Sequence, residues 1–341
     1  MSCPPATPST REKDRARGAL YGLAIGDALG MPTQLLSRRQ ITQRWGPLLT
    51  GFEPAPPGHP IAAGMPAGAV TDDTEQAVLL GRLLLSGPVD HREFAAALVA
   101  WERNMVARGS LDLLGPSTRR AVEAVLAGIP PEEAGVFGDT NGAAMRITPV
   151  GIKVAADDLR ALVDAVEEAS RVTHNTSVAL AGAAAVAAAV SAGIGGAGSA
   201  GGIAAVTSIA VDAALMGAER GHWVAGADVA ARIRWATGCV AGRPAEEAAD
   251  VIYSLVGTSL ATQESVPAAF AVLSAIPDDP WRACLLAASL GGDCDTIAAI
   301  AGAIGGAVHG LAAFPPHAVE VIDAHGFALA ELADSLLAQR Q

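Results

Sequence analysis

The chain has 341 residues, of which 51% are hydrophobic and only 4% aromatic, and its formal net charge is −12. This length suffices for a sizeable core in one large domain or two, and the scarcity of aromatic residues indicates that closely packed small side chains fill it. The acidic balance disfavours nucleic acid or an anionic membrane as the main partner, but it leaves room for a local basic pocket.

The composition also bears on compartment and domain organisation. The four cysteines show no paired spacing, which argues against disulfides or zinc and favours a reducing cytoplasm. Residues 1–13 are rich in Pro, Ser and Thr and lack an apolar signal segment, so we expect a disordered tail before one domain over residues 14–341. The apolar run 178–194 is mostly Ala and Gly and predicts a buried helix rather than a membrane span.

The first predicted helix covers residues 14–29 and ends near Gly30. Gly22, Gly26 and Gly30 are spaced so that another backbone can come close. Asp27 lies among apolar residues and needs a partner if it is buried, although an exposed position is equally compatible with the sequence. The following segment, 37–70, is broken by prolines and glycines, and we expect a long loop that flanks a cleft.

Two distant stretches combine carboxylates with hydroxyls: Thr71-Asp72-Asp73-Thr74 and Gly291-Gly292-Asp293-Cys294-Asp295-Thr296. Each opens an apolar helix, and either one alone is more often a helix cap than a ligand set. A cap, however, needs one oxygen, and neighbouring carboxylates repel each other unless a cation or a proton lies between them. Hard cations such as Mg²⁺ or Mn²⁺ prefer oxygen ligands. We therefore predict that the two stretches meet and hold a pair of divalent ions.

Helical periodicity continues through the rest of the chain, and no run alternates long enough to predict a strand. A Gly/Ser/Ala-rich segment, 191–202, predicts a flexible loop. The loop 138–146 exposes backbone N–H groups that suit phosphate or ribose contact. Asp112 is compatible with a simple turn and His174 with a cap or core position. The pattern predicts an all-α protein with about a dozen helices in one compact domain.

Five motifs, in order over residues 15 to about 310, resemble those of the ADP-ribosylglycohydrolases. They are Gly22-Leu23-Ala24-Ile25-Gly26-Asp27-Ala28-Leu29-Gly30, the Thr71 stretch, Asn141-Gly142-Ala143-Ala144-Met145-Arg146, Thr173-His174 and the Gly291 stretch. The resemblance implies a single orthogonally packed multi-helix domain with a cleft that holds two Mg²⁺ or Mn²⁺ ions. It also implies a hydrolase that acts on an ADP-ribosyl glycosidic bond.

The resemblance assigns roles to individual residues. The implied metal ligands are Thr71, Asp72, Asp73, Asp293, Asp295 and Thr296. The four aspartates also become the catalytic candidates, because one of them can accept a proton from the attacking water. The implied contacts to substrate are Asp112, Asn141, Gly142, Ala143 and His174, together with Gln34.

Two positions depart from the family pattern. Many relatives have Glu at the position of Gln34, and a neutral amide can contact water or a metal but cannot transfer a proton as a carboxyl does. Cys294 stands where Thr or Ser is common, and we expect its side chain to point away from the metals.

Three functions follow from these observations. The first is removal of ADP-ribose from a modified protein or another acceptor by a metal-dependent glycosidase. The second keeps the chemistry but takes a small ribosyl or nucleoside-like N-glycoside, which Gln34 and the lack of an obvious aromatic clamp for adenine leave open. The third is a non-catalytic binding or structural relative, which the nearly complete ligand set argues against. The sequence does not fix the acceptor, the preferred metal or the oligomeric state.

Overall fold

The centre of the fold is a pair of glycine-rich helices, α1 (Thr10–Gly30) and α16 (Cys294–His309). A Cβ atom added at Gly22 would lie 2.1 Å from the carbonyl oxygen of Gly302, and one added at Gly26 would lie 2.0 Å from that of Ala298. The two backbones therefore touch directly, as the glycine spacing predicts. We call this contact the glycine seam; its residues are Gly18, Gly22, Gly26 and Gly30 of α1 and Asp295, Ala298, Gly302 and Gly306 of α16.

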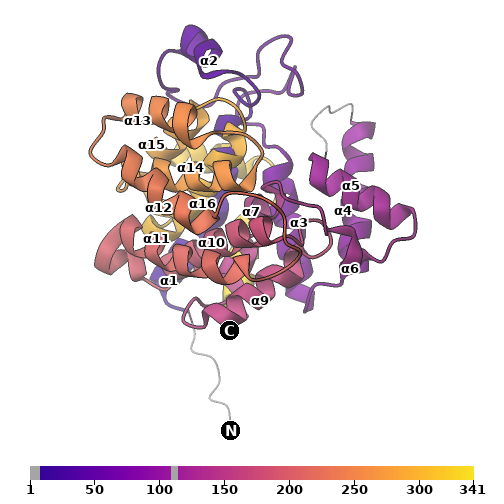
Figure 1. Cartoon of the computed structure of the whole chain (residues 1–341). Coiled ribbons are helices and arrows are strands. Elements are labelled where there is room, and N and C mark those ends of the chain that lie inside the picture. Colours follow the sequence, from indigo (N-terminus) through magenta and orange to yellow (C-terminus); the bar gives the residue numbers. More distant parts are fainter. Residues whose placement is uncertain (1–7, 109–113) are drawn as a thin grey trace.

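The computed structural model describes residues 8–108 and 114–341, and within these ranges it contains no β-strand, only two isolated bridges. Figure 1 shows the other helices arranged around the central pair. Those before residue 200 are α2 (Arg38–Trp45), α3 (Asp72–Ser86), α4 (His91–Ala107), α5 (Pro116–Leu126), α6 (Pro131–Ala134), α7 (Gly142–Arg146), α8 (Thr148–Lys153), α9 (Leu159–Ser170), α10 (Ser177–Ile194) and the start of α11 (Ala197–Ala218). Those that follow are α12 (Val229–Val240), α13 (Ala245–Val251), η1 (Ile252–Val256), α14 (Thr262–Ala275), α15 (Pro280–Ala288), η2 (Leu311–Ala313), α17 (Pro316–Asp323) and α18 (Leu329–Ala338).

Helix α10 lies deep in the core. It is long and apolar enough to cross a membrane by length and composition alone, but 94% of it is buried inside the fold. It packs against α11, α8 and the central helix α16. Its Ala-rich sequence leaves little room between neighbouring helices, which agrees with the predicted buried helix and with a core built from small side chains.

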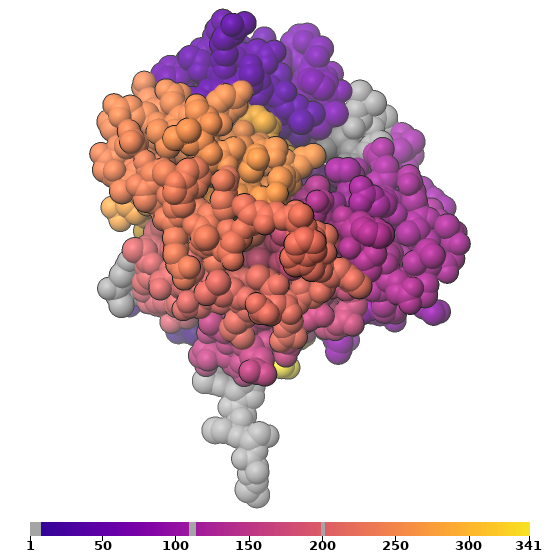
Figure 2. Space-filling model, viewed as in Figure 1, coloured from indigo at the N-terminus to yellow at the C-terminus, as the bar shows by residue number. Residues whose placement is uncertain are grey.

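Helices α4, α5 and α6 form a unit with its own small core, to which Phe94, Leu98 and Trp101 belong. In Figures 1 and 2 this unit (magenta) stands to one side of the main body. The first residues of α5 face the rest of the molecule and line a cavity described below. The unit therefore contributes one wall of the candidate site.

The all-α prediction is confirmed, but two boundaries differ from the sequence prediction. The first helix begins earlier than the predicted residue 14, at Thr10, where Ser9 and Glu12 form a capping box. The expected flexible loop at 191–202 is largely helical: α10 runs to Ile194, and α11 starts after Gly195 and Gly196 and is kinked at Gly202. Small residues here pack at helix interfaces rather than loosen the chain.

Candidate active site

The end of α1 and the start of α3 are joined by the fully buried carboxylate of Asp27. It accepts hydrogen bonds from the backbone N–H of Thr71 (3.0 Å) and of Thr74 (3.1 Å), and from the hydroxyl groups of both residues. The first turn of a helix has unpaired N–H groups, and Asp27 satisfies two of them from another helix. The partner-bound alternative for Asp27 is therefore correct, and the residue fixes the Thr71 stretch in place.

The Gly291 stretch is positioned by backbone contacts that only glycine allows. Gly291 and Gly292 have φ angles of 88° and 71°. A Cβ atom at Gly292 would lie 2.3 Å from the carbonyl oxygen of Thr258, which itself accepts a 2.7 Å hydrogen bond from the backbone N–H of Asp293. The backbone is crowded at both glycines, and this crowding fixes the path of the chain into Asp293 and Asp295.

The two acidic stretches meet although they are far apart in the sequence. The hydroxyl of Thr296 donates to Oδ1 of Asp73 over 3.3 Å. Asp72, Asp293 and Asp295 line one cavity of about 180 Å³. The full lining is Gln34, Leu35, Ile61, Asp72, Gly115, Pro116, Thr118, Thr140, Asn141, Gly142, Met145, Leu260, Asp293, Asp295 and Thr296. Thr71 and Asp73 lie behind this wall, both buried.

Burial crowds these carboxylates and raises their pKa values. The pKa of Asp73 lies well above its usual range, first because of burial and then because of the negative charges of its neighbours, chiefly Asp27 and Asp295. Burial also raises the pKa of Asp293 to about 6, against the opposing effect of hydrogen bonds from Asn141 and Thr296. A site that holds this much negative charge away from water gains from a counter-ion.

The donor set fits a hard divalent cation by its chemistry. Oδ2 of Asp73 is buried and has no hydrogen-bond partner in the described part of the chain, and the surrounding donors are carboxylate and hydroxyl oxygens. As the side chains stand, no three His, Cys, Asp or Glu residues among those described form a ready cluster for one ion. The fold thus brings the two stretches together at one cavity.

The opposite wall is formed by the loop before α7. Asn141 donates from Nδ2 to Oδ2 of Asp293 (2.5 Å) and to Oγ of Ser265 (3.0 Å). Asn141 and Gly142 line the cavity, whereas Ala143 is buried behind them. The hydrogen bond between Asn141 and Asp293 links this loop directly to the acidic stretch.

A buried hydrogen-bond chain runs behind the cavity from one wall to the other. Gln76 donates to Asp72 (2.9 Å) and accepts from Nη1 of Arg146 (2.8 Å). Arg146 also donates from Nη2 to the hydroxyl of Thr173. The same hydroxyl lies 2.8 Å from Nδ1 of His174, whose Nε2 lies 3.1 Å from the hydroxyl of Thr140. We call these groups, from Asp72 to Thr140, the buried chain; both of its ends line the cavity.

The charge of the buried chain resides on Arg146. Burial lowers the pKa of this arginine to about 10, so it stays protonated at neutral pH, and its guanidinium lies over the ring of Phe94. Burial, and then the positive charge of Arg146, holds the pKa of His174 well below its usual range. His174 is therefore neutral. Because arginine only donates, the arrangement favours a Thr173 hydroxyl that donates to Nδ1 and an Nε2–H that donates to Thr140.

The remaining substrate contacts predicted from the sequence fall in different places. Gln34 is buried at the cavity wall, and its Nε2 has no hydrogen-bond partner among the described residues. His174 does not line the cavity; its ring packs behind Gly142, where an added Cβ would lie 2.7 Å from Cε1. Cys294 is buried with its sulfur 3.3 Å from the hydroxyl of Thr33 and is absent from the lining. Asp112 lies outside the described residues.

Sequence reasoning missed several residues that shape the cavity. Thr140, at the end of the buried chain, lies inside the predicted loop 138–146, but nothing in the sequence marks its side chain as part of the cavity wall. Leu35 and Leu260 line the cavity with apolar side chains. Leu35 has a φ of 60°, which is uncommon for a residue with a branched side chain, and its N–H donates to the carbonyl of Gly292 (2.7 Å). Only the fold brings these residues to the acidic stretches.

The sequence is similar to proteins of one known family. The sequence pattern of the ADP-ribosylglycohydrolase family matches residues 8–341. The chain is 36% identical to the uncharacterized protein YegU of Escherichia coli, over 91% of this chain and 92% of the relative. It is 30% identical to the ADP-ribosylarginine hydrolase Tri1 of Pseudomonas putida, over 91% and 74% of the two chains.

The fold of a solved structure, an ADP-ribosylglycohydrolase-related protein complex, also matches. It superposes with a TM-score of 0.67 at 23% identity and covers 98% of this chain and all of the other. The match of the family pattern over nearly the whole sequence, the relatives and the fold lead to one conclusion. The chain belongs to the ADP-ribosylglycohydrolase family and is a hydrolase of the glycosidase type.

Proposed function

We propose that this protein is a Mg²⁺- or Mn²⁺-dependent hydrolase that removes ADP-ribose from a modified protein in the cytoplasm. The observation that carries the proposal is the convergence of the two acidic stretches on one cavity, with the buried Oδ2 of Asp73 left without a hydrogen-bond partner among the described residues. A scaffold without a ligand gains nothing from such crowded carboxylates, since their burial costs stability. The named activity of the relative Tri1 supports the substrate class.

The acidic residues would bind the metal ions and accept a proton. Asp72, Asp73, Asp293 and Asp295, with Thr71 and Thr296, would hold two divalent ions. Such ions, when bound, lower the pKa of a water molecule and hold vicinal ribose hydroxyls. One of the three carboxylates that line the cavity, Asp72, Asp293 or Asp295, would accept the proton of the attacking water. Hydrolysis at the anomeric carbon passes through an oxocarbenium-like transition state, which nearby negative charge stabilises.

The opposite wall would orient the substrate. The backbone N–H of Gly142 and the amides of Asn141 and Gln34 would contact ribose or phosphate oxygens. Gln34 cannot transfer a proton, so it would act as a donor from Nε2, the atom that lacks a hydrogen-bond partner among the described residues. His174 would act from behind the loop by supporting Gly142 and Thr140.

Calorimetry with ADP-ribose, with and without Mg²⁺ or Mn²⁺, tests the proposal on the wild type and on Asp293→Ala. We expect binding that depends on the metal and is lost in the variant, followed by release of ADP-ribose from an ADP-ribosylated protein. Absence of both metal binding and ADP-ribose binding would contradict the proposal and favour a non-catalytic relative.

A second candidate is hydrolysis of a small ribosyl or nucleoside-like N-glycoside. The observation that favours it is the size of the cavity, about 180 Å³, below the range of roughly 300–1,000 Å³ that is common for sites of drug-sized ligands. This candidate would be established if the protein with bound metal ions does not bind ADP-ribose but hydrolyses ribosides. The two candidates can be compared by measuring, in parallel, the release of ADP-ribose from an ADP-ribosylated protein and the release of ribose from a riboside.

A further inference from the structure

An apolar groove lies on the outer side of the α4–α6 unit, away from the acidic residues. Helix α4 contributes one stripe to it, Arg92, Ala96, Val99 and Arg103, at helical spacing. The end of α5 and the following turn contribute Leu126 and Ile129, whose side chains are 64% and 43% exposed. The groove encloses about 570 Å³. Exposed apolar side chains gathered in one groove are typical of a surface that binds another chain.

The charge of this groove is opposite to that of the protein. Its lining contains two arginines and no carboxylate, although acidic residues outnumber basic ones by 35 to 23 in the sequence. Neither Arg92 nor Arg103 forms an ion pair in the described part of the chain. Both guanidinium groups are therefore available to carboxylates of a partner.

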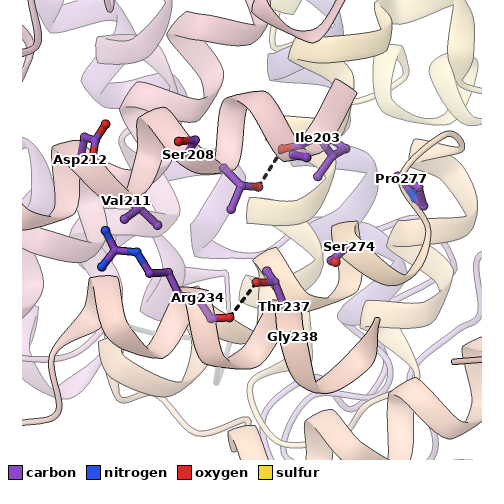
Figure 3. Close-up of a pocket in the computed structure, with 11 residues that line it drawn as sticks. Ile203, Ser208, Val211, Asp212, Arg234, Thr237, Gly238, Ser274 and Pro277 are labelled. Carbon is purple, nitrogen blue, oxygen red and sulfur yellow. Dashed lines mark hydrogen bonds between the residues drawn. The ribbon is translucent and has the colours of Figure 1, made fainter. Parts of the chain in front are cut away.

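A second groove, between α11 and α12, lacks this charge bias. Figure 3 shows Asp212 on α11 and Arg234 on α12 at the same end of it, so that both signs of charge are present. Its hydroxyl groups at Thr207 and Thr237 donate to carbonyl groups of their own helices. This groove therefore has no preference for an acidic partner. It serves as a matched reference for the first groove, which we call the α4–α5 groove.

Helix α5 connects the α4–α5 groove to the candidate active site. Its first residue, Pro116, lines the cavity, and its last, Leu126, lines the groove. Ten residues of α-helix span about 15 Å at 1.5 Å per residue. A modified protein that covers both the cavity and the outer side of α5 would therefore have to span about this distance.

We infer that the α4–α5 groove binds an acidic amphipathic helical segment of the ADP-ribosylated protein. Apolar side chains of that segment would lie on Val99, Leu126 and Ile129, and its carboxylates would pair with Arg92 and Arg103. Recognition of a helix in a groove follows this pattern of apolar anchors flanked by charge. The identity of the partner as the modified protein rests on the proposed function, but the affinity of the groove for an acidic helix does not.

The experiment uses the full chain and a fluorescein-labelled synthetic helical peptide with Leu at positions i, i+4 and i+7 and flanking Glu residues. Anisotropy measures its binding without any turnover. We expect Arg103→Glu to weaken binding about tenfold, the effect of one well-placed interface contact. Arg234→Glu makes the same charge change in the α11–α12 groove and is expected to bind as the wild type does. Equal binding by all three proteins, or none to the wild type, would overturn the inference.

A second measurement connects the groove to hydrolysis. The same peptide carrying one ADP-ribosyl-arginine is compared with free ADP-ribosyl-arginine as substrate. We expect Arg103→Glu to raise KM about tenfold for the peptide alone, with kcat and both constants for the small substrate unchanged. Equal losses on both substrates would show that Arg103 acts on folding or chemistry and would refute the docking role. If no protein hydrolyses either substrate, the proposed function fails while the anisotropy result still decides the inference.

Discussion

The same two helices, α1 and α16, build both the glycine seam and part of the candidate site, yet the two regions are made on opposite principles. In the seam, backbone packs on backbone, and a Cβ atom added at any of its glycines would collide with the backbone of the other helix. At the other end, Asp27, Asp293 and Asp295 are buried near Asp73, and burial raises the pKa of Asp27 and that of Asp293 to about 6. The seam maximises packing, whereas the cavity retains a cost that a bound cation would relieve.

The largest effect is expected from filling the seam. Gly22→Val would place Cβ 2.1 Å from the Gly302 carbonyl oxygen, and neither backbone can move without separating the central helices. We expect a loss of more than about 4 kcal/mol in the free energy of unfolding, measured by urea denaturation. Gly51→Ala is the matched control, because a Cβ there meets nothing within 4 Å. A Gly22→Val protein as stable as the control would show that the seam is not tightly packed.

The fold could be predicted from the sequence where the signal is local. Helical periodicity predicted an all-α protein, and the spacing of Gly22, Gly26 and Gly30 predicted a close backbone neighbour. The identity of that neighbour could not be read, because Gly302 is 280 residues away from Gly22 and carries no sign of its partner. The Gly/Ala-rich segment 191–202 misled for a related reason: small residues predict loops and tight helix contacts alike.

Removing Arg146 tests whether the buried chain joins the two walls of the cavity. Arg146→Met would leave Gln76 and Thr173 without their buried donor, and we expect a loss of about 3 kcal/mol in unfolding free energy, typical of breaking a buried charged network. We also expect the His174 ring to change tautomer, which the ¹⁵N chemical shifts of the ring would report. Arg340→Met is the control, because Arg340 donates hydrogen bonds to the backbone carbonyl groups of Gly151 and Ile152 and does not belong to the buried chain. Unchanged His174 shifts would show that Arg146 only fills space.

Neutralising one buried carboxylate distinguishes the cavity from the seam most directly. In Asp73→Asn the repulsion with Asp27 and Asp295 is removed, so we expect the protein without metal to become more stable. We also expect Mg²⁺ affinity to fall on the order of 100-fold, at least as much as the loss of an outer-shell group. Thermal unfolding with and without Mg²⁺ measures both. A variant less stable than the wild type without metal would contradict the argument that the site is strained.

The site could be predicted in part. The two acidic stretches, each with two carboxylates and at least one hydroxyl, predicted a shared oxygen-rich site. The structure brings Asp72, Asp293, Asp295 and Thr296 to one cavity, with Thr71 and Asp73 buried behind its wall. Contacts that depend on the path of the chain could not be predicted: Asp27 as the partner of Thr71 and Thr74, or Thr258 as the acceptor for Asp293. Nor does any local pattern place His174 behind Gly142 instead of at the cavity wall.

A smaller effect is expected from pH through His174. Its native pKa lies well below 6.5, so below pH 6.5 the unfolded chain binds a proton that the folded chain does not. Stability is therefore lost as pH falls from 6.5 toward the native pKa, by about 1.4 kcal/mol per pH unit. His174→Gln removes this contribution while it keeps a donor. Parallel pH dependence of unfolding in the two proteins would show that His174 titrates normally.

The smallest effect is expected at Cys294, between two of the carboxylates. Its side chain is buried toward Thr33 on the α1 side and does not line the cavity. Cys294→Thr keeps a side chain of similar size and replaces the sulfur beside Thr33 with a hydroxyl. Because the proposed ligands and their charge are unchanged, we expect Mg²⁺ affinity, measured by calorimetry, to stay within about twofold of the wild-type value. A large loss would mean that packing behind the acidic stretch positions the ligands as strictly as the glycine seam positions the helices. The acidic stretch around Asp293 would then resemble the glycine seam in depending on tight packing.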